Sequence, residues 1–408
     1  MAAPGEAVLP PLVLDIVGTG VPMTNRQATR QIDFPSRIER IRSTLHARRM
    51  DVAVVMSPAN ITYFSGFQAL MYSRPIYLMI DAGETVLIVP GLEEEHAASI
   101  TVVDRVEVYY EHPEKGTPGE NAPDILVDAL TSAGHSAIGL EFATAPISLD
   151  TRLKEAGMTT GNLSPAIIRM RLIKDAAEIA LMRQAAELAH IGVMATLDAA
   201  RPGESQLAIE SLGTNSILEA AARIIPEATI SLLQFTTSGP ETSLPHLITT
   251  TRRLGRPELC IHSRQVSIDG ERAELERTFA LGAMDDRTLD IFTVAEEAQL
   301  AAIDACRPGR AMREVDAAAR EIIQKAGYGE YSIHRVGHGL GIEAHEAPYI
   351  RWDNDAPLEA GMVVSIEPGI YIPGVCGARH SDTVVVTEHG PETITDAPRG
   401  VDNLVFDR

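Results

Sequence analysis

The chain has 408 residues, of which 45% are hydrophobic and 22% charged, so a globular protein of two domains is expected. A net charge of −21 and an aromatic content of 4% argue against nucleic acid and anionic membranes as partners. There is no long apolar run and no basic leader, and the three scattered cysteines form no CxxC pair, so we expect a cytoplasmic protein with reduced thiols that acts on a small molecule.

The first half of the chain predicts an α/β domain. Residues 1–35 are interpreted as an N-terminal arm. Helices are expected at 37–48 and 124–133, strands at 51–56, 75–80, 85–89 and 137–141, and a turn at 57–60. Because strands alternate with helices, we assign residues 36–165 to one α/β domain.

The second half begins with a helix start signal. Asp175 and Glu178 have the spacing of a capping box, and the helix that they open is expected to run to about residue 200. We assign residues 166–408 to a second domain, which we expect to hold the catalytic site.

A weak internal repeat divides this second domain. The segment Ala195–Gly203 parallels Ala301–Gly309, and each copy is a helix that ends at Arg-Pro-Gly. After each copy, a histidine in a loop, His246 or His345, precedes an apolar strand. The repeat predicts two αβ halves related by a pseudo-two-fold axis around a central site.

The segment from Arg335 to Asp382 carries the most chemical information. His338 and His345 lie seven residues apart in a Gly-rich loop, and Glu367 ends an apolar run just before Pro-Gly. Polar side chains at the ends of short strands are typical of an active site. This segment resembles the pita-bread family of methionine aminopeptidases, Xaa-Pro dipeptidases and creatinases. The resemblance implies a creatinase-like N-terminal α/β domain followed by a pita-bread αβ duplicate.

The peptidases of this family hold two metal ions with two aspartates, one histidine and two glutamates. The matching positions here are Glu274, His338, Glu367, Ser381 and either Ser263 or His262. Only His338 and Glu367 keep the peptidase residue type. Since a dinuclear site needs bridging carboxylates, we expect no metal and no other cofactor. A single ion held by some of His262, Glu274, His338 and Glu367 stays open.

Creatinase, the metal-free member of the family, offers the nearer match. His246 follows Gly239 by seven residues, as in the acid/base motif of that enzyme, and Leu275–Thr278 resembles the segment with its guanidinium-binding glutamate. Tyr72-Ser-Arg74 resembles the segment that binds the substrate carboxylate across the dimer interface of creatinase. The match therefore implies a homodimer.

These residues predict a metal-independent amidinohydrolase, which cleaves a C–N bond other than a peptide bond. His246 would activate water and protonate the leaving nitrogen, while His338 and His345 position or polarise the reacting group. Paired carboxylates suit a guanidino, amidino or cyclic amidine group, and an arginine fork suits the substrate carboxylate. The carboxylates would be Glu276 and Glu367, and the substrate-binding set Arg74, Tyr72, Glu274 and His262.

The chain departs from creatinase at Glu271 and Arg272, where creatinase has paired tyrosines.

Three alternative functions stay open. The first is a metallopeptidase for Xaa-Pro dipeptides, favoured by the dipeptidase-like loop from His338 to Pro348. The second is ectoine hydrolase or dimethylsulfoniopropionate lyase chemistry, and the third is a non-catalytic binding protein on the same scaffold.

Overall fold

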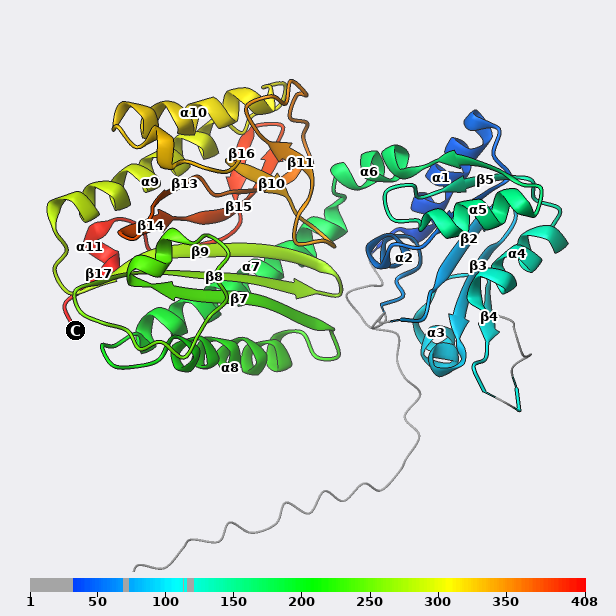
Figure 1. The fold of residues 1–408 in the computed structure, drawn as a ribbon, viewed down its shortest axis with the longest axis horizontal. Helices are drawn as coiled ribbons and strands as arrows, with labels where there is room; N and C mark the ends of the chain where they lie inside the picture. The colour runs from blue at the N-terminus through cyan, green and yellow to red at the C-terminus, as the bar shows by residue number, and fades with distance from the viewer. Residues whose placement is uncertain (1–31, 69–72, 113, 116–120) are drawn as a thin grey trace, which may run out of the picture.

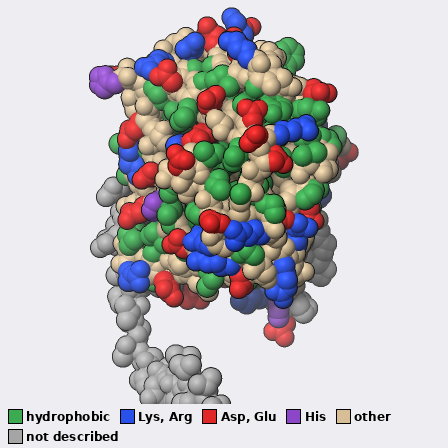
Figure 2. Space-filling model, turned by 90° about the vertical axis from the view of Figure 1, so that its left-hand side faces the viewer, with side chains coloured by type: hydrophobic (Ala, Val, Ile, Leu, Met, Phe, Trp, Pro, Cys, Tyr) green, Lys and Arg blue, Asp and Glu red, His purple; other side chains and the backbone are tan. Residues whose placement is uncertain are grey.

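The computed structural model describes residues 32–68, 73–112, 114–115 and 121–408, and it contains two α/β domains that lie side by side (Figure 1). This arrangement confirms the predicted fold class. None of the helices in the described ranges is long and apolar enough to cross a membrane. Figure 2 views the end of the molecule formed by the second domain, where acidic, basic and hydrophobic side chains are interspersed.

The N-terminal domain is a six-stranded sheet in the order β4-β3-β2-β1-β5-β6. Its strands are β1 (Val52–Val55), β2 (Tyr77–Asp81), β3 (Thr85–Pro90), β4 (Arg105–Tyr109), β5 (Ala137–Leu140) and β6 (Thr159–Asn162). Its helices are α1 (Phe34–Arg48), α2 (Pro58–Ser65), α3 (Glu94–Ile100), α4 (Ala122–Ser132), α5 (Ile147–Glu155) and α6 (Ser164–Leu172). Alternate residues of β1 pack on α1 and α2 on one face and on α4 and α5 on the other, so the strand is apolar throughout.

The predicted turn at 57–60 is instead the first turn of α2. Pro58 occupies the first helical position, where its missing N–H leaves no hydrogen bond unmade. Glu141 accepts hydrogen bonds from the backbone N–H groups of Met56 and Ser57, and this buried carboxylate fixes the start of the helix. Sequence reasoning missed α2 because Ser-Pro-Ala-Asn is also typical of a turn.

The C-terminal domain is a nine-stranded sheet with the main path β11-β10-β12-β15-β9-β8-β7, extended by β16 and β17. The strands are β7 (Ile230–Ser238), β8 (Glu258–Ile268), β9 (Glu271–Leu281), β10 (Gly337–Gly339), β11 (Glu346–Ile350), β12 (Val363–Ile366), β15 (Ser381–Thr387), β16 (Gly390–Thr393) and β17 (Val405–Phe406), and β13 (Gly369–Ile372) pairs separately with β14 (Cys376–Arg379). The helices are α7 (Ala176–Ala199), α8 (Gln206–Ile224), α9 (Asp286–Ala305), α10 (Met312–Lys325) and α11 (Val401–Leu404).

The internal repeat appears in the structure as two matched helix pairs, α7 with α8 and α9 with α10. At the first Arg-Pro-Gly, the backbone N–H of Gly203 donates to the carbonyl of Leu254 at 2.8 Å. At the second, Gly309 donates to Leu358 at the same distance. Both glycines have positive φ, so the same turn ties each helix pair to the loop before its strands.

Buried ion pairs join the two domains. Arg37 of α1 pairs with Glu178 of α7 at 3.0 Å. Glu178 also forms the predicted capping box with Asp175, which confirms the start of α7. Arg171 of α6 and Lys174, in the segment that links α6 to α7, both pair with Glu346 of β11. Because Glu346 directly follows His345, the domain interface also fixes one end of the loop that carries this histidine.

Glu271 lies buried beside this network, and we expect it to make stability depend on pH. Burial, reinforced by Glu178 and Glu346, raises the pKa of Glu271 from 4.5 to about 8. Between these values the folded protein retains a proton that the unfolded chain has released, so stability falls as pH rises, by up to about 1.4 kcal/mol per pH unit. Urea unfolding at several pH values in this window should show that Glu271→Gln flattens the slope. The exposed-carboxylate control Glu297→Gln should not.

Candidate active site

A cavity with a volume of about 1060 Å³ opens in the C-terminal domain. Its floor includes Glu367 and Arg379, and His246 and His345 line its walls. Trp352, which is 67% exposed, contributes an apolar surface to the same cavity. The cavity therefore combines ionisable groups at its base with an apolar flank, a combination typical of a small-molecule site.

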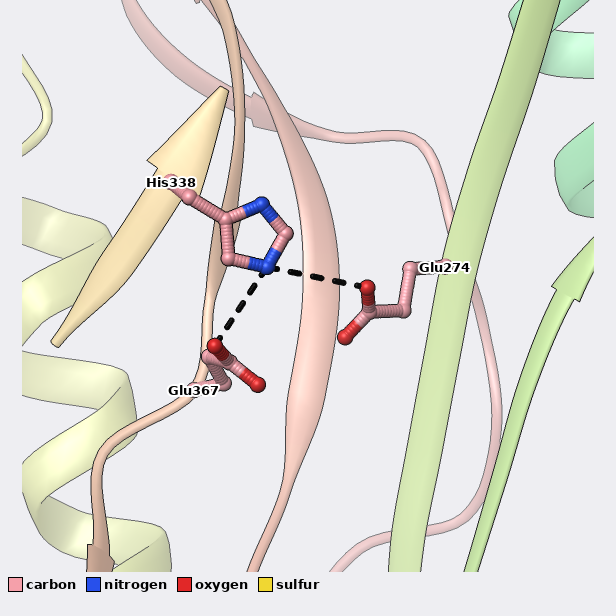
Figure 3. Close-up of side chains that lie close together, drawn as sticks. All are labelled: Glu274, His338 and Glu367. Carbon is pink, nitrogen blue, oxygen red and sulfur yellow. Dashed lines mark ion pairs between the residues drawn. The ribbon is translucent and has the colours of Figure 1, made fainter. Parts of the chain in front are cut away.

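Three potential ligand residues converge at the base of the site (Figure 3). Glu274 lies on β9, His338 on β10, and Glu367 directly after β12. Each offers one ligand atom, and the three atoms lie within 4.8 Å of one another. All three side chains are buried. The segments of the sequence that carry them are far apart, and the antiparallel pairing of these strands brings them together.

The glycines on either side of His338 are needed for this geometry. A Cβ on Gly337 would lie 2.2 Å from the carbonyl oxygen of Ser365, and one on Gly339 would lie 2.3 Å from that of Ala347. Strand β10 can therefore pack between β11 and β12 only with glycine at both positions. The Gly-His-Gly sequence thus fixes the position of the imidazole.

The hydrogen bonds of His338 define its tautomer. Its Nδ1 lies 3.0 Å from the carbonyl oxygen of Gly339 and must donate to it, so Nε2 carries the lone pair of the neutral ring. Nε2 is buried and has no hydrogen-bond partner. It lies 3.3 Å from Oε1 of Glu367 and 3.8 Å from Oε2 of Glu274. Three electron-rich atoms thus face one another, and a cation between them fits this set of donors.

The two carboxylates favour a positive charge at Nε2 of His338, whether that charge is a proton on the imidazole or a bound cation. Burial alone would lower the pKa of His338, but the carboxylates of Glu367 and Glu274 outweigh it and raise this pKa. Burial would conversely raise the pKa of Glu367, yet His338 and Arg379 hold it well below its ordinary value. Glu367 is therefore ionised, and the site attracts positive charge.

Glu276, two residues beyond Glu274 on the same face of β9, already has a cationic partner. Both of its oxygens accept hydrogen bonds from Arg379, from Nε at 2.5 Å and from Nη2 at 2.8 Å. Both side chains are buried. The planar cation that the sequence predicted for Glu276 is thus a guanidinium of the protein itself, and Glu276 is not free to hold a substrate guanidino group.

Serine hydroxyls surround Glu274. The hydroxyls of Ser381 and Ser365 lie 2.8 and 3.2 Å from its Oε1 and 2.6 Å from each other, so one serine donates to the other, which in turn donates to Glu274. Ser263 of β8 lies opposite Glu276 in the strand register, which places it on the same face of the sheet. Ser263 and Ser381 stand at positions that match metal ligands of the peptidases. Both therefore belong to the site, but they contribute neutral hydroxyls in place of charged ligands.

His345 stacks on His338, with ring centroids 3.7 Å apart. Nη2 of Arg335 lies 2.9 Å from its Nδ1, and because a guanidinium can only donate, Nδ1 of His345 is the acceptor. The proton of the neutral ring then resides on Nε2. Burial, His338 and Arg335 lower the pKa of His345 to about 4, so this neutral form persists at neutral pH.

A second group of polar side chains lies on another wall of the cavity. The hydroxyl of Tyr371 contacts Nε2 of His334 at 2.8 Å and Nη1 of Arg379 at 3.1 Å. His334 Nδ1 faces the carbonyl of Arg335 at 2.6 Å and must donate to it, so Tyr371 donates to Nε2. His246 is exposed in the loop before β8 and lines the same cavity.

Two of the predicted substrate-binding residues, His262 and Arg74, are not brought to this cluster. His262 is buried on the opposite face of β8, where Arg264 donates to its Nε2 at 2.9 Å. Since side chains alternate along a strand, His262 and Ser263 cannot face the same side. Arg74 is exposed in the N-terminal domain and pairs with Glu111 at 2.6 Å. Tyr72 lies outside the described residues.

Sequence reasoning also missed residues of the cavity. Arg335, Arg379 and His334 line it, and none of them was among the predicted site residues. Asp382, close to Arg379 in the chain, pairs with Arg277 on the far face of the sheet. Because side chains alternate along an extended segment, either Arg379 and Ser381 or His380 and Asp382 had to face the same side as Glu276. This alternation is the signal from which Arg379 could have been predicted as a site residue.

The whole chain resembles known peptidases. Residues 180–388 match metallopeptidase family M24, and residues 37–173 match the creatinase/prolidase N-terminal domain. The chain is 30% identical to an Xaa-Pro dipeptidase of Pyrococcus furiosus over 365 residues, which cover 89% of this chain and 98% of that protein. It is 33% identical over 370 residues to an Xaa-Pro dipeptidase of Lactobacillus delbrueckii subsp. lactis, covering 88% and 96%. The prolidase structure from Pyrococcus horikoshii OT3 matches with a TM-score of 0.80 at 27% identity, covering 90% and 99%.

These relatives overturn the expectation of a metal-independent, creatinase-like amidinohydrolase. That prediction was wrong, as was the assignment to C–N bonds other than peptide bonds, because the similar proteins are Xaa-Pro dipeptidases. The pairing of Glu276 with Arg379 gives the physical reason, since it removes one of the two carboxylates assigned to the substrate cation. From both its sequence and its fold, the chain belongs to metallopeptidase family M24 and carries a creatinase/prolidase N-terminal domain.

Proposed function

We propose that this protein hydrolyses peptide bonds in short peptides, with Xaa-Pro dipeptides as the substrates to test first. The observation that carries the proposal is the buried, unpartnered Nε2 of His338, which faces the carboxylates of Glu274 and Glu367. Glu367 also lines the cavity and so connects the cluster to it. These three residues would hold a divalent metal ion. When bound, such an ion polarises the scissile carbonyl and lowers the pKa of water.

The surrounding residues supply the other functions that peptide hydrolysis needs. His345, with its proton on Nε2, can donate a hydrogen bond to the carbonyl oxygen as negative charge develops there. His246 lines the cavity from an exposed loop, and we assign it to protonating the departing nitrogen. Glu276 acts indirectly, because it holds Arg379 beside Glu367.

The direct test is a hydrolysis assay with a matched set of peptides. Protein stripped with chelator and then supplied with Mn²⁺, Co²⁺ or Zn²⁺ should cleave Ala-Pro, with slower or no cleavage of Ala-Ala and of the tripeptide Ala-Pro-Ala. The chelated protein should be inactive until metal is restored. Turnover of creatine, or absence of any peptide cleavage with all three metals, would contradict the proposal.

Arg335 offers a finer test as a positioning residue. Arg335→Met keeps the length of the side chain but removes the donor that sets the tautomer of His345, and we expect kcat to fall roughly 10- to 100-fold with a smaller change in KM. ¹⁵N chemical shifts of labelled histidine would report the tautomer directly. Arg351→Gln is the control, because Arg351 lines the same cavity but pairs with Asp353. An unchanged tautomer and kcat in Arg335→Met would exclude this role.

We also propose a cytoplasmic homodimer in which Arg74 reaches the cavity of the neighbouring subunit. In support, Cys260, Cys306 and Cys376 are free and buried, and Arg74 is exposed. Sedimentation would give the oligomeric state. A monomer at working concentration would exclude the role of Arg74 across an interface.

A further inference from the structure

The charges around the cluster limit how many ions it can hold. Three buried carboxylates face the site, those of Glu274, Glu276 and Glu367. The guanidinium of Arg379 lies among them and donates to both oxygens of Glu276. The guanidinium of Arg272 is directed instead to the backbone carbonyls of Gly341 and Ile342, and carboxylates outside the cluster, those of Glu271, Glu343 and Glu346, offset its charge. Because His338 is neutral when its Nε2 acts as a ligand, two negative charges remain, and one divalent cation balances them.

The guanidinium also occupies the side of Glu367 that faces away from His338. Oε1 of Glu367 lies 3.3 Å from His338, whereas Oε2 lies 3.9 Å from Nε of Arg379. One oxygen is therefore directed to the cluster, and the other faces a fixed positive charge. A second cation beyond Glu367 would meet the guanidinium at close range in a buried site, where repulsion between like charges is strong.

Glu274 is restricted in a similar way by neutral donors. Its Oε1 lies 2.8 Å from the hydroxyl of Ser381 and 3.2 Å from that of Ser365, and since these hydroxyls also bond to each other, one of them donates to this oxygen. Its Oε2 accepts from Gln265 at 2.6 Å and faces His338, and a carboxylate oxygen has a further lone pair for a cation there. Only one oxygen of Glu274 is thus directed to a ligand position, and no oxygen bridges to a second one.

We propose that the site holds a single divalent cation, bound by Glu274, His338 and Glu367, and that the guanidinium of Arg379 supplies the second positive charge. This inference deepens the proposed function, because it defines the metal requirement of the same site. One imidazole and two carboxylates suit first-row transition metals such as Mn²⁺, Co²⁺ and Zn²⁺. Three protein ligands also leave a coordination position for water or substrate.

Metal stoichiometry tests the proposal without any assay of activity. Chelated full-length protein is dialysed against increasing Mn²⁺ or Co²⁺, and the bound metal per chain is measured by mass spectrometry. We expect a plateau at one ion per chain, and an Mn²⁺ electron paramagnetic resonance spectrum of an isolated ion. A plateau at two ions, a spectrum of exchange-coupled ions, or no binding would overturn the proposal.

Substitutions of the proposed ligand residues test which side chains bind the ion. His338→Ala and Glu367→Gln should each lose the tightly bound ion, and the exposed-histidine control His389→Ala should keep it. Since folding of the variants can be checked by circular dichroism, a folded His338→Ala protein that still binds one ion equally tightly would overturn the assignment. One bound ion without cleavage of any peptide would contradict only the proposed function, whereas peptide cleavage with two bound ions would contradict only the single-ion centre.

Discussion

Replacing His338 with alanine should lower peptide hydrolysis more than about 100-fold. Loss of a residue that only orients a metal ligand typically costs 10- to 100-fold, and His338 would be a ligand itself. Its Nε2 is the only nitrogen in the described three-residue cluster, and its flanking glycines hold β10 in place whether or not the imidazole is present. Steady-state kinetics on an Xaa-Pro dipeptide, with metal in excess, would measure the loss.

The matched control is His389→Ala, because His389 is exposed in the turn after β15. Its kinetics should equal those of the unaltered protein. Saturating metal should not restore the His338→Ala variant, since two carboxylates without the imidazole make a weaker and less directed site. Near-normal turnover by the folded variant would mean that the cluster of Glu274, His338 and Glu367 is not the reaction centre.

The largest effect on stability is expected at Asp382. Asp382 and Arg277 form an ion pair at 3.0 Å in which both side chains have 0% exposure. Gln299 and Thr395 donate to the same carboxylate at 2.8 and 2.9 Å. Asp382→Ala leaves the Arg277 charge buried and uncompensated by its partner, and we expect it to lower the free energy of unfolding by about 3–5 kcal/mol. Urea or thermal unfolding would measure this change.

A surface ion pair provides the comparison for Asp382. Arg183 and Glu392 pair at 2.5 Å, but their side chains are 45% and 44% exposed. Glu392→Ala should therefore cost less than about 1 kcal/mol. If Asp382→Ala cost equally little, the expected penalty for leaving the Arg277 guanidinium buried without its carboxylate partner would be wrong.

Glu276 shows how the tertiary structure supplies a partner that the sequence does not reveal. The sequence predicted Glu276 as one of two carboxylates for a substrate cation, and the structure places it on β9 beside the cluster. What the sequence did not reveal was that Arg379, more than a hundred residues later along the chain, donates to both of its oxygens. A carboxylate facing a substrate and one neutralised by the protein look identical in sequence, because the pairing depends on the register between β9 and β15 and on the adjacent β14.

The sequence by itself determined the α/β character of the first domain, and its resemblance to the pita-bread family implied the rest of the fold class. It also determined the helix start at Asp175, the helix ends at Arg-Pro-Gly, and the candidates His338 and Glu367, because these depend on local spacing and on residues adjacent in the chain. Only the tertiary structure decided that His262 faces away from Glu274, that Arg379 neutralises Glu276, and that His338 Nε2 lies unpartnered between two carboxylates. Those facts depend on strand register and on which face of each strand is covered. A shift of one residue in register would exchange the two faces, and a strand that is buried along its whole length, such as β8, gives no alternation of burial from which to read the choice.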